Sequence, residues 1–213
     1  TSILGSLQLL SAGTAGPLPD EAREMIEIAA RGSRRLLRLV SDLLDLEKLQ
    51  SGKMSFRRER VDLAQTASES IATFTSLAGA KRVRLELRSE IPNAFVTADA
   101  DRVAQVLANL LSNAIKFSPD GASVLVTVER RSAALRVSVR DAGPGVPDDF
   151  RARIFAPFSQ ADGSDSTTTG GSGLGLSISR EIVNGLGGEI GFESRVGDGA
   201  CFYFELAGVV EGA

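Results

Sequence analysis

The chain has 213 residues, of which 43% are hydrophobic and 24% are charged, and its formal net charge is −3. This length suits one large domain or a moderate domain with a smaller companion, and the apolar content is sufficient for a packed core. The small negative charge argues against a general affinity for nucleic acid or for an anionic membrane surface. The chain contains no histidine, which excludes histidine-based triads, metal ligands and general bases within it.

The single cysteine, Cys201, lies in an alternating apolar segment, which favours a buried thiol and leaves no disulfide within one chain. No apolar run approaches the roughly 20 residues that a membrane span requires. The start of the chain has no signal-peptide pattern. Reducing, intracellular conditions fit this composition, and a first residue of Thr1 rather than Met indicates a fragment.

Two helices are predicted at the start of the chain. Residues 2–12 carry apolar side chains at helical spacing and are followed by helix-ending glycines and prolines from Gly13 onward. Asp20 is a plausible N-cap of a second helix over residues 20–50, whose apolar stripe is wider than a two-stranded seam. Two copies of this hairpin would form a four-helix bundle, and the alternative is that the helices pack on the rest of the same chain.

Residues 51–62 are polar and follow a Ser-Gly break, so we expect a linker or a short edge strand there. Beyond it, an α+β domain is predicted over residues 63–208. Its expected elements are a helix at 63–79, single strands at 83–87 and 94–97, a hairpin at 123–129 and 135–140, and a second hairpin at 189–193 and 201–206. This order favours a two-layer α/β sandwich, in which helices cover one face of a mixed, mostly antiparallel sheet.

The helix predicted over residues 101–119, capped by Asp99 or Asp101, has two different faces. Val103, Leu107, Leu110 and Ala114 form an apolar face, whereas three polar residues fall within about 60° of one another: Asn109, Asn113 and Lys116. A carboxamide oxygen can join the oxygen shell of Mg²⁺, and a lysine at a helix end can reach a phosphate. The alternative is an amphipathic helix with an ordinary solvated side.

Two glycine-rich segments frame the rest of the candidate site. In the first, Asp141 ends a strand and could accept from an exocyclic amine such as that of adenine, while Gly143 and Gly145 allow a flat ligand to approach. A tight turn closed by the Asp side chain is the alternative.

The second segment leads directly into an apolar-periodic helix, where free backbone N–H groups make an anion site suited to phosphates. Its glycines, Gly170, Gly171, Gly173 and Gly175, fit neither the P-loop nor the dinucleotide fingerprint, and a flexible linker is the alternative. The segment 161–169 between the two is small and polar, and we expect a mobile loop that Phe155 and Phe158 anchor and that closes over a nucleotide.

In this order, the segments resemble the motifs of the sensor histidine kinases of two-component signalling. ANLLSNAIKF resembles the family's N box, DAGPG its first glycine box, IFAPFSQ its F box and GGSGLGLSIS its second glycine box. LLRLVSDLLDLEKLQSGK resembles the second helix of the family's dimerisation domain. The resemblance covers nearly the whole chain.

The resemblance implies a hairpin at residues 1–50 that forms a homodimer, followed by a catalytic domain that uses ATP and Mg²⁺. It implies transfer of the γ-phosphate to a histidine and then to the receiver domain of a response regulator. Asn109 and Lys116 would be catalytic, Asn113 and Asn109 would be metal ligands, and Asp141 would bind the adenine amine. The implied nucleotide-binding residues are Asn109, Asn113, Lys116, Phe117, Asp141, Gly143, Gly145, Phe155, Phe158, Gly171, Ser172, Gly173, Leu174, Gly175 and Leu176.

Asn109 separates this family from its ATP-hydrolysing relatives, which resemble one another in carrying a glutamate there as general base. Because an asparagine cannot take a proton from water, transfer to histidine is favoured over hydrolysis, and an ATP-hydrolysing chaperone or DNA-repair relative is disfavoured. The chain departs from the family pattern in two ways. It holds no phosphoacceptor histidine, since it begins just beyond where that motif would lie, and it has no Lys or Arg between Arg153 and Arg180.

Two readings therefore remain. One is the kinase part of a histidine kinase, located in the cytoplasm either free or attached to a membrane through an upstream region. The other is a degenerate module that binds nucleotide or dimerises without transferring phosphate.

Overall fold

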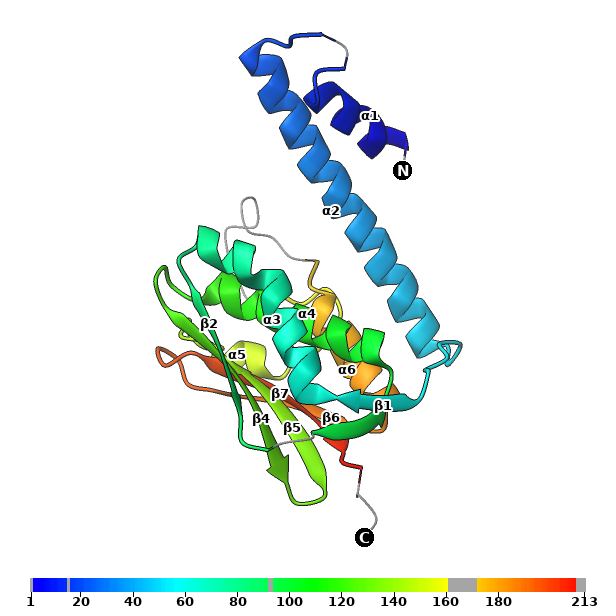
Figure 1. Ribbon diagram of the computed structural model, residues 1–213, viewed down its shortest axis with the longest axis vertical. Helices are drawn as coiled ribbons and strands as arrows, with labels where there is room; N and C mark the ends of the chain where they lie inside the picture. The colour runs from blue at the N-terminus through cyan, green and yellow to red at the C-terminus, as the bar shows by residue number, and fades with distance from the viewer. Residues whose placement is uncertain (1, 15, 92–93, 161–171, 210–213) are drawn as a thin grey trace. The chain divides into compact units, whose positions relative to one another are not determined.

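The computed structural model describes residues 2–14, 16–91, 94–160 and 172–209 (Figure 1). The chain divides into two compact units, Thr1–Glu47 and Lys48–Ala213. Among the helices of the described ranges, none combines the length and the apolar character needed to cross a membrane.

The first unit is the predicted helical hairpin. Helix α1 spans Ser2–Ser11 and helix α2 begins at Asp20 and runs to Gln50. Between them, Gly13 and Gly16 take positive φ angles of 76° and 99°, which a residue with a side chain rarely adopts. Helix α1 has no buried residue. Along α2, large apolar side chains are exposed in the single chain at Met25, Ile28, Leu36, Leu37, Val40, Leu43 and Leu44.

The second unit is built on a five-stranded sheet in the order β2-β4-β5-β7-β6. Strands β2 and β4 are parallel, and the other neighbouring pairs are antiparallel. The mixed, mostly antiparallel sheet that the sequence predicted is therefore confirmed. The strands are β2 Arg84–Ser89, β4 Ser123–Arg131, β5 Ala134–Arg140, β6 Glu189–Ser194 and β7 Ala200–Ala207.

A separate two-stranded ribbon precedes the main helix of the site. Strand β1, Glu59–Asp62, pairs antiparallel with β3, Phe95–Ala98. Strand β1 lies in the segment 51–62, for which a linker or a short edge strand was expected. Because β3 leads into the helix that begins at Ala100, the ribbon brings residues 59–62 close to the start of that helix.

Three helices lie together over one face of the sheet in Figure 1, as a two-layer sandwich requires. They are α3 Leu63–Ala80, α4 Ala100–Phe117 and α6 Gly175–Gly185. A fourth, α5 at Asp148–Arg151, has only four residues, too few for the sequence periodicity to reveal it. Core side chains come from both layers, and the fully buried ones include Leu107, Leu110 and Leu111 of α4 and Phe204 of β7.

Candidate nucleotide-binding site

Helix α4 is the element on which the candidate site is built. The Asp99 carboxylate caps its start, accepting from the backbone N–H of Arg102 at 3.2 Å. At its other end the Lys81 ammonium donates to the carbonyls of Ile115 and Lys116, at 3.1 and 2.6 Å, which complements the negative end of the helix dipole. The predicted apolar face is buried at Val103, Leu107, Leu110 and Ala114.

The carboxamide of Asn109 joins α4 to the second glycine-rich segment. Its Nδ2 donates to the carbonyl oxygen of Gly175 at 3.1 Å and to the Ser179 hydroxyl at 3.2 Å. A Cβ at Gly175 would lie 3.4 Å from both Cγ and Oδ1 of Asn109, an ordinary van der Waals distance, so the Asn109 side chain lies directly against the start of α6. Two motifs that are 66 residues apart in sequence thus meet through one side chain.

Asn113 lies one turn further along α4, on the same side as Asn109. Its half-buried side chain has no hydrogen bond to the part of the chain that the structure describes. The Lys116 ammonium lies 4.8 Å from the centre of the Phe117 ring, which is itself 45% exposed. The end of α4 therefore presents a carboxamide, a cation and an accessible aromatic ring close together in sequence.

Asp141 is buried, with 8% of its surface exposed, directly after β5. Its Oδ1 accepts from the backbone N–H of Gly143 at 2.8 Å and from that of Ala200 at 3.2 Å. Burial raises the pKa of this carboxyl above its ordinary value, and the two backbone hydrogen bonds and the charge of Arg140 oppose the rise. Within the described ranges the hydrogen bonds engage Oδ1 alone, so Oδ2 is the oxygen left to accept from a ligand.

The first glycine-rich loop packs against the end of α4. A Cβ on Gly143 would lie 2.9 Å from the carbonyl oxygen of Phe117, so only glycine allows this approach. The contact places the loop that carries Asp141 beside the end of the helix that carries Asn113 and Lys116. Gly145, at a φ of +78°, passes against the backbone of Arg195 in the same way.

The turn between β6 and β7 supports this loop, and the sequence reasoning missed it. The Ser194 hydroxyl accepts from the backbone N–H of Val146 at 2.9 Å and donates to the carbonyl oxygen of Gly199 at 2.8 Å. Ala200, the next residue, donates to Asp141. The glycines of this turn indicated a hairpin, but no local signal indicated that the hairpin would hold the Asp141 loop.

The two aromatics of the IFAPFSQ segment lie in different environments. Phe155 packs edge-on against Phe192 and Phe202, with ring centres 6.1 and 6.5 Å apart. Phe155 is therefore packed among aromatic rings, and its expected role as an anchor of the loop at 161–169 stays a prediction because that loop lies outside the described residues. Phe158 differs from the expectation of an anchor, because 63% of its surface is exposed and its φ is +59°. Its backbone, rather than its ring, lies against Gly173.

The second glycine-rich segment leads into α6, whose N-cap, Leu174, makes no side-chain capping bond. The first-turn N–H groups therefore have no capping side chain, as an anion site requires. The predicted residues Leu174 and Leu176 present apolar side chains to the core: Leu174 is buried, and Leu176, like Phe155, packs against the buried cluster of Val146, Ile154 and Ala200. Ser172 accepts from the Leu174 N–H at 3.2 Å. Gly170, Gly171 and the expected mobile loop at 161–169 lie outside the described residues.

The donor set of the site fits a cation that arrives with a nucleotide. Within the described residues no three acidic, cysteine or histidine side chains cluster to hold a metal on their own. Mg²⁺ commonly keeps several waters and is held by one or two protein groups together with substrate phosphates. Asn113, with its unbonded carboxamide, and Asn109 could supply those oxygens.

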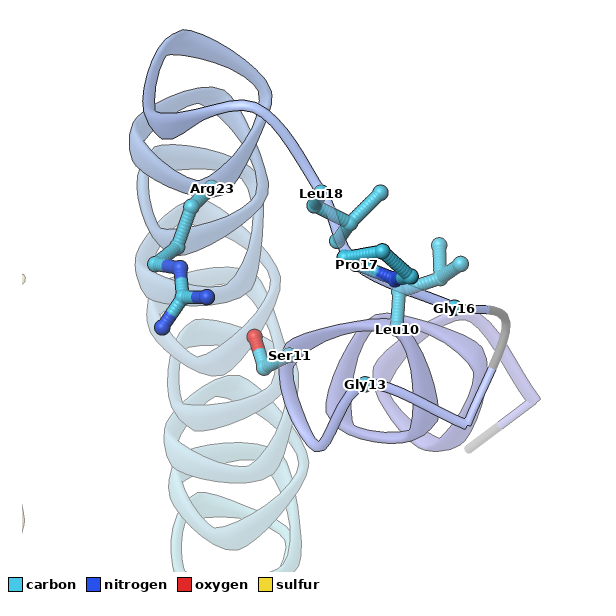
Figure 2. A pocket seen from close by; sticks show the side chains of 7 residues that line it. All are labelled: Leu10, Ser11, Gly13, Gly16, Pro17, Leu18 and Arg23. Atoms are coloured by element: carbon cyan, nitrogen blue, oxygen red, sulfur yellow. The ribbon is translucent and has the colours of Figure 1, made fainter.

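A small cavity of about 160 Å³ lies in the first unit, at the turn between α1 and α2 (Figure 2). Leu10, Pro17 and Leu18 lie beside one another there, with Ser11 and Arg23 on the other side. Ligand sites usually measure about 300–1,000 Å³, and the lining includes no candidate site residue. The cavity is therefore a packing gap of the hairpin turn.

Two family models match the chain. The model described as histidine kinase-, DNA gyrase B-, and HSP90-like ATPase matches residues 98–208. The model described as His Kinase A (phospho-acceptor) domain matches residues 1–52. The first match contains α4 and both glycine-rich segments.

Curated relatives align with most of the chain. The chain is 36% identical over 189 residues to hybrid signal transduction histidine kinase D of Dictyostelium discoideum, with 86% of this chain and 12% of that protein covered. It is 33% identical over 204 residues to the circadian input-output histidine kinase CikA of Synechococcus elongatus, with 95% of this chain and 27% of that protein covered. The chain thus spans about a quarter or less of these relatives.

Solved structures share the fold. Full-length ShkA in complex with AMPPNP matches with a TM-score of 0.81 and 29% identity, over 100% of this chain and 44% of that one. The histidine kinase ThkA in complex with the response regulator protein TrrA matches with a TM-score of 0.72 and 25% identity, over 97% of this chain and 59% of that one. The helical hairpin followed by a two-layer sandwich is therefore an arrangement found in histidine kinases.

Proposed function

The chain belongs to the sensor histidine kinases of two-component signalling, and from this membership we propose that its second unit binds ATP with Mg²⁺ and transfers the γ-phosphate to a histidine. The 213 residues contain no histidine, so the acceptor is supplied from outside them. The observation that carries the proposal is the Asn109 carboxamide, which joins the α4 surface to the glycine-rich start of α6.

In this proposal, different residues contact the adenine, the phosphates and the metal ion of the bound nucleotide. Asp141 accepts from the adenine amine through Oδ2, since Oδ1 is already engaged by two backbone N–H groups. The uncapped start of α6 binds phosphate oxygens. Asn113 and Asn109 offer oxygens to Mg²⁺, which neutralises negative charge on the phosphates when it is bound.

Residue 109 also favours phosphate transfer over hydrolysis. Water must lose a proton as it attacks phosphorus, and the neutral Asn109 amide cannot accept one. A neutral imidazole nitrogen attacks with its own lone pair, so the new P–N bond forms, the bond from the γ-phosphorus to the bridging oxygen breaks and ADP departs. No general base from this chain is needed for that step.

The exposed apolar side of α2 supports the other part of the proposal, a homodimer through residues 1–50. Leu36, Val40 and Leu43 are spaced at three- and four-residue steps and are exposed in the single chain. A second copy of the hairpin would bury them in a four-helix bundle. The phosphohistidine would then pass its phosphate to an aspartate of a response-regulator receiver domain. The reaction uses cytoplasmic ATP and would take place in the cytoplasm.

The test is transfer in trans. The chain is incubated with radiolabelled ATP and Mg²⁺, alone and with an acceptor chain that carries the same hairpin preceded by a histidine-containing helical segment and has Asn113→Ala in its own catalytic domain. We expect acid-labile, base-stable label on the acceptor chain only. The same incubation with Asn113→Ala in both chains is the control and should give no label.

The second reading, a module that binds nucleotide without transferring phosphate, predicts ATP binding and no label on either chain. Label on the 213-residue chain itself would contradict the proposed division between catalytic unit and acceptor.

A further inference from the structure

The two ends of the Asn109 carboxamide have opposite hydrogen-bonding properties. Oδ1 is an acceptor and Nδ2 is a donor with two protons, so the orientation of the amide decides what α4 offers to a cation or a phosphate. A magnesium ion is attracted to Oδ1 and repelled by the amide protons. Some group must therefore hold the amide in one orientation if Asn109 is to face Mg²⁺.

The contacts of α6 define that orientation. The carbonyl oxygen of Gly175 has no proton to donate, so the end of the Asn109 amide 3.1 Å away must be Nδ2. The second amide proton points to the Ser179 hydroxyl at 3.2 Å, and Ser179 is fully buried. A half-turn of the amide would place Oδ1 against the Gly175 carbonyl and would leave both protons unpaired from α6.

We propose that Ser179 is a positioning residue that, together with the Gly175 carbonyl, holds the Asn109 amide with Nδ2 toward α6 and thereby leaves Oδ1 for the Mg²⁺ that accompanies the bound nucleotide. The inference rests on the proposed function and extends the site to a residue in the second turn of α6. Gly175 contributes only a backbone oxygen, which no side-chain substitution removes. The Ser179 hydroxyl is therefore the partner of Asn109 that a substitution can remove.

Ser177 provides a matched control on the same helix. It is also buried, at 2% exposed, but its hydroxyl donates to the carbonyl oxygen of Leu174 at 2.8 Å. Ser177→Ala and Ser179→Ala thus remove the same atom from neighbouring buried positions, and only Ser179→Ala removes a partner of Asn109.

The first experiment measures ATP affinity of the 213-residue chain by calorimetry, with Mg²⁺ and with EDTA. Ser179→Ala is expected to weaken binding about 3- to 10-fold in Mg²⁺, the effect of one lost neutral hydrogen bond. In EDTA, Ser179→Ala should change ATP affinity no more than Ser177→Ala does. The loss should disappear in an Asn109→Ala background, because Ser179 then has no amide to orient.

The second experiment needs neither nucleotide nor a variant. Nuclear magnetic resonance of the unmodified chain compares exchange of the side-chain amide protons of Asn109 and Asn113 with solvent. We expect slower exchange at Asn109, whose amide protons are bonded to α6, than at Asn113. Equal exchange rates would overturn the inference even if Ser179→Ala fails to fold.

The outcomes separate the inference from the function on which it rests. If Asn109→Ala leaves Mg²⁺-dependent ATP binding unchanged, the proposed role of Asn109 is wrong. If Asn109→Ala weakens binding while Ser179→Ala behaves like Ser177→Ala, the site is correct and the positioning role of Ser179 is wrong.

Discussion

The backbone N–H of Arg57 donates to Oδ2 of Asp99 at 2.9 Å, while Oδ1 of the same carboxylate caps α4. One buried side chain thus connects the segment that precedes β1 to the helix that carries Asn109 and Asn113. The neighbouring residues of that segment reach the other helix of the site: Phe56 lies against Gly185, and the Arg58 guanidinium donates to the carbonyl oxygen of Gly185 at 3.4 Å. Residues 56–58 therefore contact the start of α4 and the end of α6 together.

The first prediction concerns Asp99. Asp99→Ala removes a helix cap and a second hydrogen bond, so we expect the free energy of unfolding to fall by about 2–3 kcal/mol. Asp101→Ala is the matched control, because Asp101 lies in the same turn with an exposed side chain and pairs with Arg57 only at 3.6 Å. It should cost less than about 1 kcal/mol. Urea denaturation followed by circular dichroism measures both, and equal losses would contradict the role of Asp99.

The second prediction concerns Gly185, the last residue of α6. Alanine is normally favoured over glycine in a helix by up to about 1 kcal/mol, but a Cβ at Gly185 would lie 2.5 Å from Cζ of Phe56. Gly185→Ala is therefore expected to destabilise the protein by about 1–3 kcal/mol. Gly79→Ala, near the end of α3 with no atom within 4 Å of its Cβ, should be neutral or stabilising.

A double variant tests the cause of the Gly185 effect. Adding Phe56→Ala removes the ring that the new methyl group meets, so the two substitutions together should cost less than the sum of their separate costs. Thermal denaturation of the four proteins gives this comparison, and strict additivity would show that the ring is not the obstacle.

The third prediction concerns nucleotide recognition by Asp141. Asp141→Asn keeps the shape of the side chain but removes its charge and places an amide donor where Oδ2 would accept. We expect the free energy of ATP binding to become less favourable by about 1–3 kcal/mol, which is the contribution of a charge-assisted hydrogen bond. Asp149→Asn, at an exposed position of α5, is the control and should bind as the parent does. Unchanged affinity in Asp141→Asn would refute the assignment.

The fourth prediction concerns stability and pH at the same residue. Burial raises the pKa of Asp141 in the folded state, so the folded protein binds this proton more tightly than the unfolded chain does. The residue therefore favours folding most below the ordinary carboxyl pKa, and this contribution is lost as the pH rises through the folded-state value. The stability of Asp141→Asn relative to the parent should increase over that pH range in nucleotide-free protein, as denaturation at several pH values would show. A constant difference would contradict the burial effect.

The fifth prediction concerns Asn113 and the metal. If its carboxamide contributes to the oxygen shell of Mg²⁺, the cation should tighten ATP binding, and Asn113→Ala should remove most of that gain while affinity in EDTA stays unchanged. Ser112→Ala, at the exposed neighbouring position, is the control. Calorimetry that found equal ATP affinity with and without Mg²⁺ in the parent chain would exclude the metal role.

The sequence by itself determined the hairpin, the sandwich, the apolar face of α4 and the family, because each follows from information local to a segment. Helical and strand periodicities are properties of consecutive residues, and Asp99, one of two caps considered, could be named from its place before the helix. The ordered motifs identified the family without any knowledge of how they meet in space.

Only the tertiary structure decided which atoms of these motifs face one another. Nothing near Asn109 in sequence indicates that its Nδ2 bonds to Gly175 and Ser179, because that contact forms when α6 packs on α4. The same holds for Ala200, which lies 59 residues further along the chain and donates to Asp141, and for Phe158, which is exposed although Phe155 three residues earlier is packed. Such contacts depend on the register of the sheet and on which helix faces meet, and these are properties of the whole folded domain rather than of any one segment.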